Sequence, residues 1–154
     1  MTIVKARKEH SKKISELMLS ELEIHGLRFP DKLIKGLREH AKEENILREF
    51  EDGNLIAFVA ITSRKLVGFI VGYEDLSKDC AMIHYITSTS IKIKEELLER
   101  FIKECKYRDI SKIITDTFEF MSNKEFFESN RFVLVKKERL AVDLEMLWYE
   151  FRLT

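Results

Sequence analysis

The chain has 154 residues, the length of one domain of ordinary size. Charged residues make up 35% of it, with 27 basic and 27 acidic side chains, so no overall field would gather nucleic acid or an anionic membrane surface. We therefore expect neither partner. The chain lacks Gln, has a single Pro and is rich in Lys, Glu and Ile, a bias that favours a thermophilic source with surface ion-pair networks.

The first residues, MTIVKARKEHSKK, carry charges where a signal peptide needs an apolar run. No apolar segment approaches the roughly 18 residues that a membrane helix requires. The sequence therefore predicts a soluble, cytoplasmic protein.

The sequence predicts no metal site. Cys80 and Cys105 are too few and too far apart for a metal site or a disulfide framework, and Cys105 continues an apolar stripe, so it is expected to be buried. His10, His25 and His40 follow no ligand spacing.

Hydrophobic periodicity and end signals predict a short opening strand and then two helices. Ser11 can cap the first helix, which Gly26 ends, and Pro30 is suited to the first position of the second. The expected bounds are residues 2–7 for the strand, Ser11 to Gly26 for the first helix and Pro30 to about Glu44 for the second, with no element predicted for residues 45–51.

The remainder alternates between strands and helices. Near-continuous apolar runs after a DGN turn predict a hairpin whose strands are buried on both faces. The expected strands are residues 55–61, 66–73, 81–87, 111–118, 131–142 and 144–153, and the expected helices are residues 90–106 and 123–130. This order predicts a mixed sheet with helices on both faces, in the α+β to α/β range.

Several strings in this order resemble the GNAT superfamily of N-acetyltransferases. LIAFVAITSRKLVGFIVGY is similar to the family's central hairpin, and EFFESNRFVLVKK is similar to a stretch the family usually writes as Phe-Tyr-Glu-x-x-Gly-Phe. MIHYIT, the helix after it and KIITDTF resemble the fourth strand, main helix and fifth strand. The resemblance covers nearly the whole chain. It implies one GNAT-like domain over residues 1–154, with a mostly antiparallel sheet of six to seven strands that splays between the fourth and fifth strands.

The resemblance also implies transfer of an acetyl group from acetyl-CoA to an amine of a small molecule or a protein, by direct attack in a ternary complex. In the family, pantetheine bonds to the fourth strand inside the splay, and the phosphates reach the start of the next helix, where free N–H groups favour anions. The cofactor-binding residues that the resemblance implies are Ile86, Thr87, Ser88, Ser90, Lys92, Ile93, Lys94, Asn123 and Phe127.

The chain departs from the family at the helix start, where Ser90, Lys92 and Lys94 occupy positions that are usually glycine and about two residues are missing. The lysines have two interpretations: they contact phosphate as point charges, or they are solvated surface lysines. Phe127 occupies the place of a Tyr that protonates the departing thiolate in many members, so Phe127→Tyr is expected to speed transfer. By count, Phe120 holds the place of a CoA-contacting Asn, for which Asn123 could substitute.

A base must accept a proton from the acceptor ammonium, and the family often draws it from the fourth or fifth strand. His84 and Tyr85, expected to face opposite sides of their strand, and Asp116 on the fifth strand are the catalytic candidates. Glu119, just past that strand, is a further candidate, although an exposed loop acid is usually only solvated.

Two functions follow from these patterns. The first is an acetyl-CoA-dependent N-acetyltransferase. The alternative is a catalytically impaired GNAT-fold binding or assembly domain with weak or no CoA binding, which the missing glycines, Phe127 and Arg131 favour. The aromatic residues Trp148, Tyr149 and Phe151 at the end of the sheet are expected in the core or in a homodimer contact.

Overall fold

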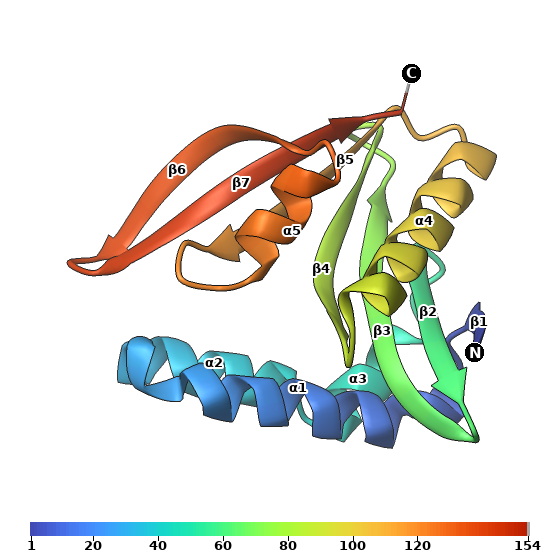
Figure 1. Cartoon of the computed structure of the whole chain (residues 1–154), viewed down its shortest axis with the longest axis horizontal. Helices are drawn as coiled ribbons and strands as arrows, with labels where there is room; N and C mark the ends of the chain where they lie inside the picture. The colour runs from blue at the N-terminus through green and yellow to red at the C-terminus, as the bar shows by residue number, and fades with distance from the viewer. Residues whose placement is uncertain (154) are drawn as a thin grey trace.

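A computed structural model describes residues 1–153 and shows one twisted sheet with helices on both faces (Figure 1). Within these residues the sheet has seven strands in the order β1-β2-β3-β4-β5-β7-β6. Every neighbouring pair is antiparallel except β4 and β5, which are parallel. The strands are β1 Thr2–Lys5, β2 Leu55–Thr62, β3 Lys65–Asp75, β4 Cys80–Ser88, β5 Lys112–Phe118, β6 Val133–Ala141 and β7 Leu144–Arg152. The predicted mixed, mostly antiparallel sheet is confirmed.

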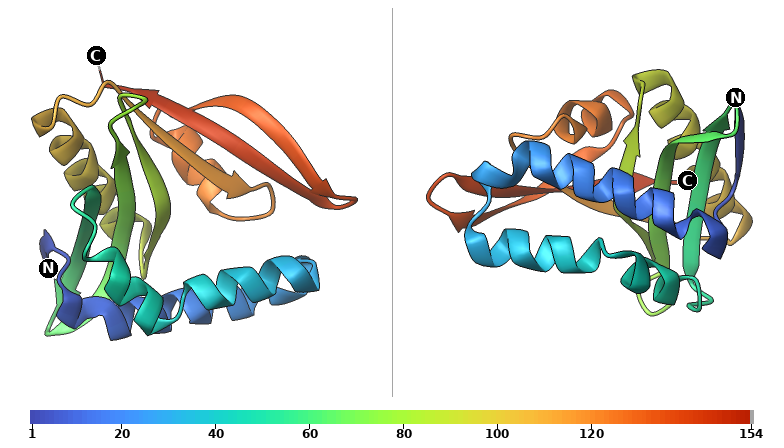
Figure 2. Two further views of the ribbon diagram at one scale, coloured as in Figure 1. Left: turned by 180° about the vertical axis from the view of Figure 1, so that it is seen from behind. Right: turned by 90° about the horizontal axis from the view of Figure 1, so that it is seen from below.

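The helices form two groups, one on each face of the sheet. The α-helices are α1 Ser11–His25, α2 Asp31–His40, α3 Glu43–Glu49, α4 Ile91–Tyr107 and α5 Asn123–Ser129, and two 3₁₀ turns are η1 Lys8–His10 and η2 Gly26–Arg28. Helices α1 to α3 pack in a cluster with the β3 residues Phe69 and Val71, whereas α4 and α5 share a cluster with Ile70. Figure 2 shows α1 and α2 side by side beneath the sheet.

Strands β2 and β3 are hydrophobic along most of their length because both faces of the hairpin are buried, as predicted. Successive β2 residues alternate between the two clusters, with Phe58 on the α4 side and Val59 on the α1 side, and both are nearly inaccessible to solvent. The turn between the strands uses Ser63 and Arg64, which have φ angles of 48° and 65°. Positive φ at both central residues is the requirement of the tight turn that suits a twisted hairpin.

The predicted C-terminal end of the second helix, at about Glu44, is wrong. It stops at His40, and a separate helix, α3, begins at Glu43 and extends into residues 45–49, for which no element was predicted. Ala41 accepts a hydrogen bond from the buried hydroxyl of Ser15 on α1, at 2.7 Å, and Lys42 adopts an extended conformation. The break is therefore set by a tertiary contact, which the local sequence does not encode.

Ser11 does not cap α1 as predicted. The 3₁₀ turn η1 precedes the helix, and Ser11 is the first residue of α1 itself. The buried Ser11 hydroxyl has no hydrogen-bond partner among the described residues. The turn is instead held by His10, whose Nδ1 accepts a hydrogen bond from the Arg7 amide at 2.9 Å.

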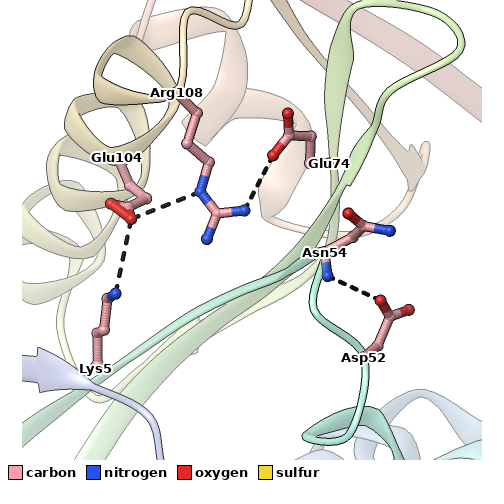
Figure 3. Close-up of polar contacts among 6 residues, drawn as sticks. All are labelled: Lys5, Asp52, Asn54, Glu74, Glu104 and Arg108. Carbon is pink, nitrogen blue, oxygen red and sulfur yellow. Dashed lines mark hydrogen bonds and ion pairs between the residues drawn. The ribbon is translucent and has the colours of Figure 1, made fainter.

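An ion-pair network ties the C-terminal end of α4 to the sheet (Figure 3). The Arg108 guanidinium contacts Glu74 of β3 at 3.1 Å and Glu104 of α4 at 3.6 Å, and Glu104 also lies 3.8 Å from the Lys5 ammonium. Cys105, in the same stretch of helix, is a buried free thiol, as predicted, and burial raises its pKa to about 12. These contacts hold the C-terminal end of α4 to the sheet, and the candidate site lies at its N-terminal end.

Strand β6 lies at the outer edge of the sheet and carries exposed apolar side chains, including Val133 and Val135. Tyr149 on the neighbouring β7 is buried in the core, as its alternating pattern predicted. The homodimer expected at this end of the sheet stays a prediction.

Candidate functional site

Strands β4 and β5 separate halfway along their length. Their parallel pairing runs from Cys80 and Lys112 to Ile83 and Thr115, and the Thr115 hydroxyl donates a 3.1 Å hydrogen bond to the Ile83 carbonyl at the last pair. Beyond it, the two strands diverge (Figure 1). In the described structure the second half of β4, through Ser88, has no β5 partner, so this strand edge presents peptide groups to which an extended amide chain can bond.

The sequence-predicted residues Ile86, Thr87 and Ser88 lie on this unpaired half of β4. The Ile86 side chain is buried in the core, so this residue can contribute only its backbone edge to a ligand. Thr87 and Ser88 are partly exposed, and their side chains are open to contact.

A β-bulge changes the direction of the β4 side chains at the point where β4 and β5 separate. Val71 pairs with Tyr85 and Gly72 pairs with Ile83, so His84 is an extra residue in the ladder. A Cβ on Gly72 would lie 2.3 Å from the Met82 carbonyl oxygen, a contact that only glycine avoids. The bulge corrects one expectation: His84 and Tyr85 do not face opposite sides, because both line the same cavity.

This cavity, of about 190 Å³, lies between the sheet and helices α1 to α3. His40, Glu49 and His84 gather at one end, which we call the polar end, and Tyr85 is the fourth polar residue of the lining. The rest of its lining is aliphatic and consists of Ile14, Met18, Leu22, Leu37, Ile46 and Val71. We call it the β4 cavity.

The polar end of the β4 cavity holds a neutral imidazole beside a hydrogen-bonded His–Glu pair. The His40 Nε2 lies 3.2 Å from the Glu49 carboxylate, and that hydrogen bond raises the pKa of His40. The His84 ring packs edge-on against Tyr73, 4.9 Å between centroids, and burial lowers the pKa of His84. Burial and then Glu49 raise the pKa of Tyr73. His84 is therefore uncharged near neutral pH and can accept a proton.

Glu21 of α1 lies beside Tyr85 and is a site residue that the sequence predictions missed. One carboxylate oxygen of Glu21 and the Tyr85 hydroxyl are both buried and make no hydrogen bond within the described residues. Burial first, and Glu21 second, raise the pKa of Tyr85, so its hydroxyl keeps its proton at neutral pH. The signal was available, because Glu21 falls on the helical stripe of Ile14 and Met18. An acidic residue on the apolar stripe of a helix indicates a buried carboxylate with a functional role.

The start of α4 offers hydrogen-bond donors. Ser90 is the N-cap and its hydroxyl accepts from the Ile93 amide at 3.2 Å. The Ser88 hydroxyl donates to the Ser90 carbonyl, which fixes the turn from the strand. The amides of Ile91 and Lys92 have no partner among the described residues, so two N–H groups at the positive end of a helix are free to bind an anion.

The two lysines of this segment lie in different surroundings. Lys92 is exposed on the helix surface. Lys94 is half-buried and crosses to α5, where its ammonium donates to the Asn123 side chain and lies 4.7 Å from the centre of the Phe126 ring. Burial lowers the pKa of Lys94. The solvated interpretation thus describes Lys92, whereas Lys94 places a partly desolvated cation between α4 and α5.

Phe127 is a core residue. It is 1% exposed and packs against Phe132 and Tyr149, with ring centroids at 5.1 and 6.2 Å. A hydroxyl added to this ring would be buried with it. Phe127 therefore offers no surface to a cofactor in this structure, in contrast to its sequence-predicted role.

Asp116 is the first β5 residue past the last β4–β5 pair, so it lies across the divergence from His84. Burial raises its pKa to about 6, well above the ordinary carboxyl value, although it does not line the β4 cavity. Glu119 is exposed, as an ordinary loop acid would be.

Within residues 1–153, no group of three His, Cys, Asp or Glu side chains is arranged to hold a metal ion. None of the helices in the same residues is long and apolar enough to cross a membrane.

Neither a protein-family model nor a curated protein matches this sequence, but solved structures match the whole fold. The PaiA N-acetyltransferase of Thermoplasma acidophilum, in complex with coenzyme A, is 19% identical, with a TM-score of 0.77 over 97% of this chain and 98% of that one. A GNAT-family acetyltransferase of Staphylococcus aureus Mu50 is 20% identical, with a TM-score of 0.78 over 99% of both chains. The aminoglycoside 6′-N-acetyltransferase of Enterococcus faecium is 17% identical, with a TM-score of 0.73 over 100% and 98%. The arrangement of the seven-stranded sheet and its helices is thus shared with these structures as a whole: this chain has the GNAT acetyltransferase fold.

Proposed function

We propose that the protein is an N-acetyltransferase that moves an acetyl group from acetyl-CoA to an amine. The observation that carries this proposal is the divergence of β4 from β5, because it leaves an unpaired strand edge between the two β4 residues that line the β4 cavity and the free amides at the start of α4. Structures with the same fold include N-acetyltransferases in complex with coenzyme A, which supports the same ligand here.

The residues present suit acetyl-CoA in the following way. The amides of its pantetheine would bond to the β4 edge from Tyr85 to Ser88, as an added strand does. Its phosphates would accept from the Ile91 and Lys92 amides, and the Lys94 ammonium would supply the charge. In this proposal Ser90, Lys92 and Lys94, at positions that are usually glycine, keep the phosphates farther from the backbone amides. The charge of Lys94 compensates for the weaker amide contacts.

The acid–base roles follow from the polar end of the β4 cavity. The acceptor ammonium gives a proton to the neutral His84 imidazole, and the freed amine nitrogen attacks the thioester carbonyl carbon. A C–N bond forms and the C–S bond breaks, so the nitrogen loses its second proton and the departing thiolate gains one. The Tyr85 hydroxyl, which stays protonated at neutral pH, is the proposed relay: it gives its proton to sulfur as it takes the second proton of the nitrogen, with Glu21 beside it. Asp116, across the divergence, is the alternative base.

Positioning carries most of the rate in this proposal. Holding two reactants in attack geometry is equivalent to effective concentrations of about 10⁵ to 10⁸ M, whereas one general acid or base contributes about 10² to 10⁴. The absence of a hydroxyl at Phe127 is therefore compatible with turnover.

The test is release of free thiol from acetyl-CoA in the presence of a panel of primary amines. The expected result is amine-dependent release that falls about 10² to 10⁴ in kcat for His84→Asn, the cost of losing a general base. His10→Asn is the matched control, because an Asn side chain can still accept the hydrogen bond from Arg7. If no amine supports release and acetyl-CoA does not bind, the proposed function is wrong; unchanged kcat in His84→Asn would remove His84 from the mechanism.

A further inference from the structure

The β4 cavity identifies a class of acceptor. We propose that it binds the compact apolar group of a primary monoamine, with the amine nitrogen at the end formed by His84 and Glu49. This inference rests on the proposed function, since it names the acceptor of that reaction.

The volume of the β4 cavity limits the size of the group. A cavity of about 190 Å³ compares with an engineered protein cavity of about 150 Å³ that holds benzene. A phenyl ring, or a branched alkyl group of similar bulk, fits with one or two further carbons. An amino sugar of several rings does not fit.

The lining selects apolar groups. Ile14, Met18 and Leu22 project from successive turns of α1 and form one wall, and Val71 of β3 lies on the sheet side. All four are less than 9% exposed, so their positions are fixed by packing. Each buried methylene of an acceptor is expected to improve binding by about fourfold. A sugar hydroxyl would lose its water here without gaining a partner.

The charges at the polar end select a single cation. Among the described residues that line the cavity, Glu49 is the one carboxylate, and it is already paired with His40 at 3.2 Å. The Glu49 side chain is only 18% exposed, so it is shielded from screening by solvent. One ammonium can share this carboxylate. Glu21 lies beside Tyr85 and is not part of the lining, so a second or third ammonium of a polyamine would find no further carboxylate on the cavity wall.

The location of the polar end suits the reaction. His84 and Tyr85 belong both to the cavity lining and to the first part of β4 past its last pair with β5. A nitrogen held there lies beside the strand edge on which the thioester is proposed to bind, while the apolar group points away toward α1.

The test compares amines of one charge and different bulk with amines of several charges. With acetyl-CoA as donor, kcat/KM for benzylamine and 2-phenylethylamine is expected to exceed that for methylamine, spermidine and kanamycin by at least about 100-fold. Equal or better use of spermidine or kanamycin would overturn the acceptor class while leaving the proposed acetyl transfer intact.

Two variants of Leu37 test the cavity itself. Leu37 is only half-buried on α2, so it can change size without unfolding the core. Leu37→Phe, which fills the cavity, is expected to lower kcat/KM for benzylamine at least 10-fold. Leu37→Ala, which widens it, is expected to shift the preference toward 1-naphthylmethylamine. Leu33→Phe is the control, because Leu33 is also half-buried on the same helix but does not line the cavity. Unchanged preferences in both Leu37 variants would refute the assignment.

A binding measurement separates this inference from the proposed function. Benzylamine is titrated into the full chain without acetyl-CoA and followed by NMR shifts of the Met18 methyl group. A shift that is lost in Leu37→Phe supports the subsite even if no acetyl transfer is found. Acetyl transfer to amines without any shift at Met18 would refute the subsite and leave the transferase standing.

Discussion

Replacement of Asp116 by Asn is expected to stabilise the protein in a pH-dependent manner. Burial raises the Asp116 pKa from 3.8 to about 6, so the folded state resists ionisation of this carboxyl more than the unfolded state does. The protonated Asp116 carboxyl therefore makes its full contribution to folding stability below pH 3.8, and this contribution is lost as the pH rises through about 6. The two pKa values differ by about 2, and each pKa unit corresponds to about 1.4 kcal/mol, which gives an upper bound of about 3 kcal/mol at pH 8.

The assay is urea unfolding of the parent and Asp116→Asn at pH 4 and pH 8. The variant is expected to be about 1 to 3 kcal/mol more stable at pH 8, where the parent must bury a charge, and to differ by less than about 1 kcal/mol at pH 4. Asp109→Asn is the control, because Asp109 is exposed and its positive φ of 58° suits Asn. A variant that is less stable at pH 8, or a difference that does not depend on pH, would show that the carboxylate is stabilised by a partner and would refute the reasoning.

Three further substitutions test the site and its support. Lys94→Met is expected to weaken acetyl-CoA binding about 10- to 100-fold, the value of a charge-assisted hydrogen bond, as measured by calorimetric titration. Phe127→Tyr is expected to lose about 1 to 3 kcal/mol of unfolding free energy, because its hydroxyl would be buried without a partner, and to leave the transfer rate unchanged. Gly72→Ala is expected to cost about 1 to 3 kcal/mol in urea unfolding, because its Cβ would lie 2.3 Å from the Met82 carbonyl oxygen and 2.7 Å from the Phe101 ring.

Matched controls accompany these variants. Lys92→Met removes an exposed lysine two positions away and is expected to change acetyl-CoA affinity by less than about threefold. Gly36→Ala, where the new Cβ meets nothing within 4 Å, is expected to stabilise α2 by up to about 1 kcal/mol. Equal effects at Lys92 and Lys94 would contradict the distinction between the two lysines. Faster transfer by Phe127→Tyr at unchanged stability would show that this ring reaches the reacting sulfur.

The sequence predicted the regular elements well, because their signals are local. Period-two alternation located β7, and the apolar stripe that Cys105 continues located α4. The break between α2 and α3 was not predictable, because it depends on the Ser15 hydroxyl of a distant helix reaching the Ala41 carbonyl. Local propensity carries no information about such a contact.

The sequence named His84, Tyr85, Lys92 and Lys94 as candidates, but it did not predict how they are arranged. His84 and Tyr85 were expected on opposite faces by strand alternation, and the bulge opposite Gly72 brings both to one cavity. The sequence also could not separate Lys92 from Lys94, since only packing against α5 buries the second. Which of two neighbouring side chains enters a site depends on the elements placed around it, and those come from distant parts of the chain.

The most direct measurement of the central claim is backbone amide hydrogen exchange with and without acetyl-CoA. If acetyl-CoA binds along the unpaired half of β4 and the start of α4, the amides of residues 84–93 are expected to exchange up to about 100-fold more slowly at a ligand concentration 100 times the Kd. Residues 123–129 of α5 are expected to follow, because Lys94 joins α4 to this helix. Unchanged exchange over residues 84–93 at saturating acetyl-CoA would contradict the account.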